Sequence, residues 1–211
     1  QKKPSNGSKK IIQEIEARKI KYLIHFTSIA NLESILTHGF IPRSDLENTG
    51  TTFELNDQER RDGRKDCTCF SLEYPNEFFM RRYRNKNLCV LRLNIKQIVE
   101  FHDGKIFYTM HNAATKMCRD RLSSNPESLS THNAFINMFK EENPDTRHPY
   151  TRSEKGIKKY LPTNHQSEIL ISGKLNPEYI EDIFFHSKED LDTFIKDMEN
   201  IILLSRFSFV C

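Results

Sequence analysis

Three polar segments of this sequence could carry chemistry, and each adjoins an apolar run. The first is Ile24-His-Phe-Thr27, where an imidazole and a hydroxyl leave an apolar strand just before a helix is expected to begin. A helix N-terminus offers unbonded N–H groups and the positive end of its dipole. We therefore expect His25, Thr27 and Asn31, one turn into that helix, to bind an anion or a ribose. The alternative is a histidine that only satisfies local hydrogen bonds.

The second segment is the arginine cluster Gln58-Glu-Arg-Arg-Asp-Gly-Arg64. A guanidinium group binds phosphate oxygens with two parallel hydrogen bonds, so the cluster predicts a diphosphate clamp. The alternative interpretation is a charged segment exposed to solvent.

The third segment is Asn164-His-Gln-Ser-Glu-Ile-Leu-Ile171, in which one carboxylate opens an apolar strand. At a strand start Glu168 could face a cleft, accept a hydrogen bond from a ribose hydroxyl, stabilise a sugar cation or take a proton from a nucleophile. No second carboxylate lies nearby in the sequence, which argues against a two-acid glycosidase.

Several common sites are absent from the sequence. There is no Gly-x-Gly-x-x-Gly, P-loop, Gly-x-Ser-x-Gly, His-Glu-x-x-His or EF-hand pattern. The five Cys are an odd number without zinc-ligand spacing, which favours a reduced, cytoplasmic protein without a metal. No apolar run is long enough to span a membrane, and no secretory signal pattern is found.

The composition predicts one globular α+β domain over residues 1–211, with residues 1–9 as a flexible lead-in. The 211 residues are 36% hydrophobic, enough for a core, and we expect two small, mostly antiparallel sheets flanked by helices. The predicted strands are 22–26, 67–72, 88–93, 168–172, 180–186 and 201–210. The predicted helices follow Ser8, Pro75 and Ser187 and cover 112–118 and 131–140, with a hairpin around Asp103-Gly104. A further helix follows the strand 22–26, with Thr27 or Ser28 as its cap and Gly39 as the left-handed residue at its end.

Charge is distributed unevenly along the chain. Residues 60–121 contain 14 Lys or Arg and 7 Asp or Glu, whereas residues 180–200 contain 2 and 7. A basic middle region suits a polyanion such as a nucleic acid or a dinucleotide. Ordinary solvated surfaces are the alternative.

The ordered set of segments resembles one known family. The blocks that carry the resemblance are His25-Phe-Thr-x-x-x-Asn-Leu-x-x-Ile-Leu-x-x-Gly39, Gln58-Glu-Arg-Arg61, Cys69-Phe-Ser-Leu-Glu-Tyr-Pro-Asn76, Asn112-Ala-Ala114, Gln166-x-Glu-Ile-Leu-Ile171 and Pro177-x-x-Ile180. Together they resemble the DarT family, NAD-dependent ADP-ribosyltransferases that modify bases of single-stranded DNA as toxins of toxin–antitoxin pairs. The resemblance implies an ADP-ribosyltransferase-like fold whose two sheets form an NAD cleft.

The resemblance also implies roles for particular residues. His25, Thr27 and Asn31 would bind NAD, with Ser71 near the nicotinamide ribose. Arg61 would steady the phosphates or the reacting centre, although Arg60 and Arg64 lie close enough for a one-residue slip to exchange their faces. Glu168 would be the catalytic carboxylate.

Acceptor and partner follow from the same resemblance. Asn112 would contact the target or NAD, and the loop before Glu168 would contact DNA through Arg152, Lys155 and Tyr160. The family modifies thymine or guanine, and the pattern after Phe70 favours guanine slightly. A cognate antitoxin of the ADP-ribosyl hydrolase type is also implied.

Other functions remain open at this point. The acceptor could be RNA or protein, and NAD-dependent removal of an RNA 2′-phosphate is a related reaction, which the Gln166-x-Glu168 pair disfavours. A non-catalytic nucleic-acid-binding module would use the basic region alone.

Overall fold

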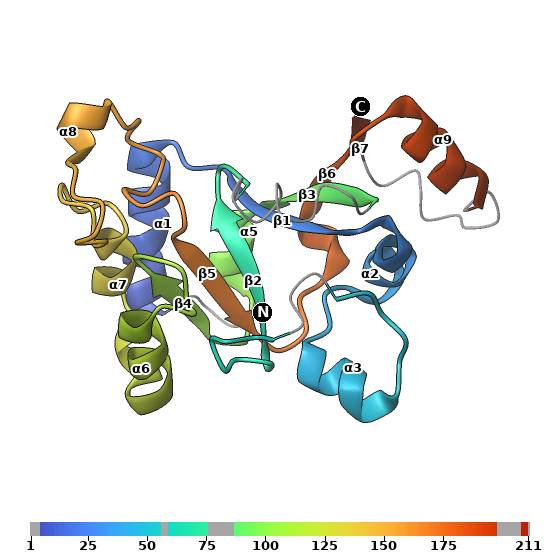
Figure 1. Cartoon of the computed structure of the whole chain (residues 1–211), viewed down its shortest axis with the longest axis horizontal. Coiled ribbons are helices and arrows are strands. Elements are labelled where there is room, and N and C mark those ends of the chain that lie inside the picture. Colours follow the sequence, from blue (N-terminus) through green and yellow to red (C-terminus); the bar gives the residue numbers. More distant parts are fainter. Residues whose placement is uncertain (1–4, 56–58, 76–86, 198–207, 211) are drawn as a thin grey trace.

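A seven-stranded sheet forms the centre of the chain (Figure 1). The computed structural model describes residues 5–55, 59–75, 87–197 and 208–210. The strand order is β4-β5-β2-β1-β3-β6-β7, and all neighbours are antiparallel except β6 and β7. The strands are β1 Tyr22–Ser28, β2 Cys67–Leu72, β3 Leu88–Asn94, β4 Ile106–Thr109, β5 Glu168–Ser172, β6 Ile180–Phe185 and β7 Ser208–Val210.

The two expected sheets are therefore two halves of one sheet. The strands β1 and β2 pair only at Leu23↔Leu72 and Ile24↔Ser71, whereas β1 pairs with β3 along seven residues. This short ladder joins the β4-β5-β2 half to the β1-β3-β6-β7 half. The prediction of an α+β fold with mostly antiparallel strands is confirmed, and the number of sheets was wrong.

Helices gather at the two ends of this sheet (Figure 1). In that view α1, α6, α7 and α8 lie at one end, and α2, α3 and α9 at the other. The helices are α1 Asn6–Arg18, α2 Leu32–His38, α3 Arg43–Thr49, α5 Ile95–Phe101, α6 Lys116–Ser124, α7 His132–Asn137, α8 Arg152–Lys155 and α9 Lys188–Asp197; the 3-10 helices are η1 Ile29–Asn31, η2 Pro126–Leu129 and η3 Pro177–Tyr179.

Helix α1 begins earlier than the expected flexible lead-in allows. The Ser5 side chain accepts a hydrogen bond from the Ser8 N–H, so Ser5 caps the helix and residues 6–9 are helical. Ile11 and Ile15 are buried in the core, and α1 packs against α5 and α7. Packing of this apolar face stabilises a helix that polar residues 6–9 would not form alone.

The hairpin expected around Asp103-Gly104 is replaced by a helix and an edge strand. Asn94 caps α5 by accepting a hydrogen bond from the Gln97 N–H, and Ile95 and Ile98 are buried. The strand β4 then pairs with β5 rather than with β3. The helix expected over 112–118 likewise begins only at Lys116, because residues 112–115 form a turn that leads into the cleft described below.

Gly39 ends α2 and closes it onto a distant segment. The N–H groups of Phe40 and Leu175 each donate to the other residue's carbonyl, both at 2.9 Å. Gly39 has a φ of +81°, and a Cβ there would overlap the Leu175 carbonyl oxygen. The turn that was expected at Gly39 is therefore needed for a long-range contact as well as for the helix end.

Two expected elements lie wholly or largely outside the described residues. The helix expected from Pro75 falls on residues 76–86, and the strand expected over 201–210 is described only at 208–210, where it forms β7. Among the residues that are described, no helix is long and apolar enough to cross a membrane.

Candidate active site

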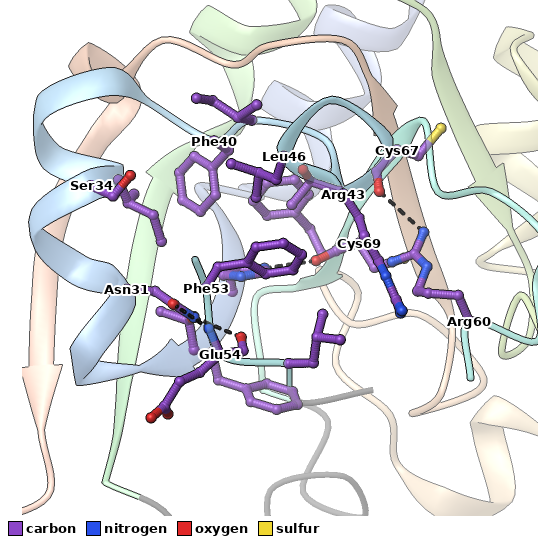
Figure 2. Close-up of a pocket in the computed structure, with 18 of the residues that line it drawn as sticks. Asn31, Ser34, Phe40, Arg43, Leu46, Phe53, Glu54, Arg60, Cys67 and Cys69 are labelled. Carbon is purple, nitrogen blue, oxygen red and sulfur yellow. Dashed lines mark hydrogen bonds between the residues drawn. The ribbon is translucent and has the colours of Figure 1, made fainter. Parts of the chain in front are cut away.

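A cleft opens where β1 and β2 diverge. The residues of β1 from Ile24 onward and those of β2 up to Ser71 line a cavity of about 280 Å³, together with residues of α2, the segment 51–55, Arg60 and Glu168. Figure 2 shows the ring of Phe53 pointing into this cavity beside Phe40 and Leu46. The cavity therefore has apolar and aromatic walls beside a few polar groups, which is typical of a ligand site.

His25 bridges the two diverging strands. Its Nδ1 lies 2.9 Å from the Cys69 carbonyl oxygen, and its ring packs edge-on against Phe40 at 5.1 Å between centroids. Because a carbonyl oxygen only accepts, Nδ1 carries the proton and Nε2 is an acceptor. Burial, together with a smaller effect of the Arg60 charge, lowers the pKa of His25 to about 4, although the Cys69 hydrogen bond opposes this shift. The ring is neutral at physiological pH.

Asn31 holds the segment 51–55 over the cleft. Its amide nitrogen donates to Thr27 Oγ1 at 3.1 Å and to the Glu54 carbonyl at 2.9 Å, and its Oδ1 accepts from the Glu54 N–H at 2.8 Å. Figure 2 shows the Asn31–Glu54 hydrogen bonds. This arrangement brings Thr27, Asn31 and the Phe53 ring to one wall of the cavity. Asn31 acts here by positioning the cavity wall.

Arg60 rather than Arg61 faces the cleft. The Arg60 side chain is 13% exposed and pairs with Asp62 at 3.1 Å. It also donates to the Cys67 carbonyl at 3.1 Å, a hydrogen bond drawn in Figure 2. Arg61 is 71% exposed, pairs with Glu59 and is not among the residues that line the cavity. The reason lies in the backbone, because Arg60 adopts a φ of +40° at the start of a turn closed by the Gly63 N–H and the Arg60 carbonyl.

The buried charge of Arg60 is stabilised by its surroundings. Although burial opposes ionisation, Cys69, Asp62 and Glu168 raise the pKa of Arg60 above its ordinary value. Its side chain is thus a permanent cation inside the cleft, close enough to Glu168 for the two charges to interact.

Glu168 lies at the first position of β5 and enters the cleft beside Asn112. Its Oε2 accepts the Ala113 N–H at 2.6 Å, and its main chain is hydrogen-bonded to Thr109 Oγ1. The turn 112–115 thus fixes the carboxylate, and Asn112 and Ala114 line the same cavity. Ser71 also lines it and is 8% exposed.

The structure therefore brings together six of the predicted residues, His25, Thr27, Asn31, Ser71, Asn112 and Glu168, and leaves Arg61 outside. Sequence reasoning missed Phe53, Asp62 and the role of the turn after Thr109. A single aromatic residue in the polar segment Asn48–Asp66 was the only local signal for Phe53.

Apart from Asn112, the residues expected to contact DNA are not among those that line the cavity. Arg152 and Lys155 belong to α8, at the opposite end of the molecule from α3 (Figure 1). Arg152 donates to the carbonyls of Leu161 and Lys158 at 2.8 and 2.9 Å and to Thr163 Oγ1, so it holds its own loop together. Lys155 is exposed and Tyr160 is 37% exposed.

Comparison with known proteins decides the family. The model of the family DarT, described as ssDNA thymidine ADP-ribosyltransferase, matches residues 24–206. The chain belongs to the DarT family. The resemblance derived from the ordered sequence blocks is confirmed, and the family's activity is the transfer of ADP-ribose to single-stranded DNA. No curated protein is similar enough in sequence to match.

Solved DarT structures share this fold at low sequence identity. Thermosipho africanus DarTG in complex with ADP-ribose matches with a TM-score of 0.56 and 14% identity, covering 90% of this chain. This chain spans only 49% of that DarTG chain. Thermus sp. 2.9 DarT matches in complex with NAD+ (TM-score 0.51, 12% identity, 91% and 95% of the two chains) and with ADP-ribosylated ssDNA (0.52, 15%, 92% and 94%).

The cleft suits NAD as the co-substrate of a DarT enzyme. Arg60 supplies a buried cation, Phe53 and Phe40 supply ring faces, and His25 Nε2 is an acceptor for a hydroxyl or amide. Within the described part of the chain, no three His, Cys, Asp or Glu side chains are grouped as metal ligands.

Proposed function

We propose that this chain transfers ADP-ribose from NAD to thymine in single-stranded DNA, with Glu168 as the catalytic carboxylate and Arg60 as its cationic partner. The observation that carries the proposal is the position of Glu168. Its carboxylate is held by the Ala113 N–H inside the same cavity that His25 and Arg60 line.

NAD would lie along β1 and the segment 51–55. We assign the nicotinamide-ribose end to His25, Ser71 and Glu168, since these polar groups meet where β1 and β2 part. The Phe53 ring offers a stacking face, and Thr27 lies beside Asn31 at the same wall. We assign to Arg60 the role expected of Arg61, because Arg60 lines the cavity and Arg61 does not.

Glu168 would act on the ribose. The bond between ribose C1′ and the nicotinamide nitrogen breaks, and nicotinamide leaves as a neutral molecule while positive charge develops on the ribose. A carboxylate beside C1′ stabilises that charge most strongly at the transition state. A nitrogen of the acceptor base then bonds to C1′ and loses its proton, for which Glu168 is the base within reach.

Thymine is proposed as the acceptor because the family description names thymidine. The slight preference for guanine derived from the residues after Phe70 has no support in that description. We propose Asn112, 9% exposed at the cavity wall, for contact with the base, and Lys155 and Tyr160 for more distant DNA contacts. Arg152 would support that loop from within.

A toxin role, the cytoplasm as its place of action and an antitoxin of the ADP-ribosyl hydrolase type complete the proposal. Their support is the family and the match to a DarTG chain about twice as long as this one. Expression in bacteria should arrest growth, and co-expression of an ADP-ribosyl hydrolase should restore it.

The test is incubation of the purified protein with NAD and single-stranded oligonucleotides, followed by mass spectrometry. We expect one added ADP-ribose on an oligonucleotide that contains thymine and none on one without it. Glu168→Gln should lower the rate by about 10²- to 10³-fold, as the loss of an electrostatic catalytic group does. Modification of a guanine-only oligonucleotide would overturn the choice of base.

Nicotinamide release distinguishes the remaining alternatives. Release without a DNA adduct would indicate an RNA or protein acceptor, which the same mass measurement on those acceptors would identify. Salt-dependent DNA binding with no NAD consumption would indicate a non-catalytic binding module.

A further inference from the structure

We infer that His111, held by Asp145, is a positioning residue that orients the Glu168 carboxylate through the turn 111–113. The inference rests on the proposed role of Glu168 and adds a residue that does not line the cavity. It is carried by a series of contacts that joins the loop after α7 to the catalytic strand.

The turn after β4 is built around buried polar groups. Thr109 is fully buried, and its hydroxyl lies 2.7 Å from the His111 carbonyl and 2.9 Å from the Glu168 carbonyl. His111 is 5% exposed, and its Nδ1 accepts the N–H of Asn112 at 2.7 Å. The next N–H along the chain, that of Ala113, is the one donated to Glu168 Oε2. The His111 imidazole therefore fixes the orientation of the Asn112 N–H, and the Ala113 N–H that binds the Glu168 carboxylate belongs to the next peptide group.

The protonation state of His111 follows from these partners. Since Nδ1 accepts a hydrogen bond, the proton of the neutral ring is on Nε2, which lies 3.4 Å from Asp145 Oδ2. Burial lowers the pKa of His111, against the effect of Asp145, and the charges of Arg147 and His165 lower it further. A neutral ring with Nε2–H directed at Asp145 keeps Nδ1 available as an acceptor for Asn112.

Asp145 is itself held in place by the loop that carries it. Its side chain is 12% exposed and pairs with Arg147 at 3.1 Å on the solvent side. Asn143, 8% exposed, donates to the His148 carbonyl at 2.7 Å and accepts from Asn164 at 2.7 Å. The loop is thereby tied to Asn164, four residues before Glu168, so both ends of the series are fixed relative to β5.

The turn affects the reaction by fixing the direction of the Glu168 carboxylate. A backbone N–H at 2.6 Å holds one carboxylate oxygen and thereby aims the other. If the turn relaxes, the carboxylate can rotate about its side-chain torsions, and a misplacement of about 1 Å can cost about 10²-fold in rate. NAD binding depends mainly on β1, α2 and Arg60 and should change little.

The test measures NAD affinity by calorimetry and the single-turnover rate of transfer to a thymine oligonucleotide. The variants are His111→Ala, His111→Asn and His111→Gln. Asn places its Oδ1 near the position of Nδ1 and keeps the acceptor for the Asn112 N–H, whereas Gln reaches toward Asp145 without that acceptor. We expect a rate loss of at least tenfold for Ala and Gln, recovery to within about threefold for Asn, and NAD affinity within about threefold throughout.

His102→Ala is the matched control. His102 is a partly buried histidine whose Nε2 lies 2.9 Å from the Ser172 carbonyl, at the opposite end of β5 from Glu168. Loss of the His102 contact to Ser172 should leave the transfer rate within about twofold of the wild-type rate. Equal rates for His111→Asn and His111→Gln would overturn the inference, even if His111→Ala fails to fold. If Glu168→Gln itself keeps the wild-type rate, the proposed function fails instead.

Discussion

Arg60 and Arg61 are neighbours in the chain, yet one is buried in the cleft and the other points to solvent. Arg60 is 13% exposed and paired with Asp62, and Arg61 is 71% exposed and paired with Glu59. The positive φ of Arg60 turns its side chain toward β2, where it meets the Cys67 carbonyl and Cys69 Sγ.

This difference predicts unequal effects of the same substitution. Arg60→Lys should lower ADP-ribosyl transfer by at least about tenfold, since a lysine cannot reproduce the planar, multidentate contacts of the guanidinium. Arg61→Lys should keep the rate within about twofold. Single-turnover transfer assays measure both, and a larger loss for Arg61→Lys would return the catalytic role to Arg61.

Substitution of Asn31 should weaken NAD binding more than it slows chemistry. Asn31→Ala removes the hydrogen bonds to Glu54 that hold the segment 51–55 and Phe53 at the cavity. Loss of that ordered wall should raise the KM for NAD by about 5- to 20-fold, which corresponds to about 1 to 2 kcal/mol, with kcat within about threefold.

The control for Asn31 is Glu33→Ala, an exposed residue of α2 outside the cavity lining. Nicotinamide release at varied NAD gives both constants. A drop in kcat at unchanged KM would assign Asn31 to the reacting centre instead of the cavity wall.

Acidification should destabilise the fold through His25. Its folded-state pKa of about 4 lies below the ordinary value of 6.5, so the unfolded chain takes up the proton first as pH falls. The stability is present above about pH 6.5 and is lost progressively toward pH 4, by up to about 3 kcal/mol for this one group.

Urea unfolding at pH 7.0 and 4.5 measures the effect. His25→Asn should show a smaller loss of unfolding free energy between the two pH values than the wild type. The pKa of His111 is also lowered by burial, but His111 is present in both proteins and adds the same pH dependence to each. Equal losses of unfolding free energy in the wild type and the variant would contradict a His25 that stays neutral in the folded protein.

Substitution of Arg152 should lower the stability of the fold, whereas substitution of Lys155 should change DNA binding. Arg152→Ala leaves the Leu161 and Lys158 carbonyls without their donor, which should lower the free energy of unfolding by about 1 to 3 kcal/mol. Lys155→Ala should change stability by less than about 0.5 kcal/mol.

The two variants should also differ in how salt affects DNA binding. If Lys155 contacts a phosphate, Lys155→Ala reduces the salt dependence of oligonucleotide affinity by about one ion-release equivalent. Binding isotherms at several salt concentrations give this slope, and an unchanged slope would remove Lys155 from the DNA path.

The sequence alone predicted the strands, helix caps and helix ends that depend on interactions between neighbouring residues. The apolar strand at Tyr22, the cap at Ser28, the helical segment that follows and the glycine at position 39 were all predictable from neighbouring residues. Glu168 at the start of β5 was predictable for the same reason, since an apolar run with one leading carboxylate has few other interpretations.

Tertiary structure decided what depends on contacts between distant residues. Residues 95–101 became a helix rather than part of a hairpin because Ile95 and Ile98 bury against the core. The two half-sheets became one through a two-residue ladder between Leu23–Ile24 and Ser71–Leu72. No periodicity encodes such a pairing, because its partners are almost fifty residues apart.

The choice between Arg60 and Arg61, and the approach of Asp145 to His111, also needed the folded chain. A loop residue has no periodic face, so the direction of its side chain is set by the burial and hydrogen bonds that the rest of the fold supplies. The sequence alone determined the kind of chemistry, whereas packing decided which side chains meet to perform it.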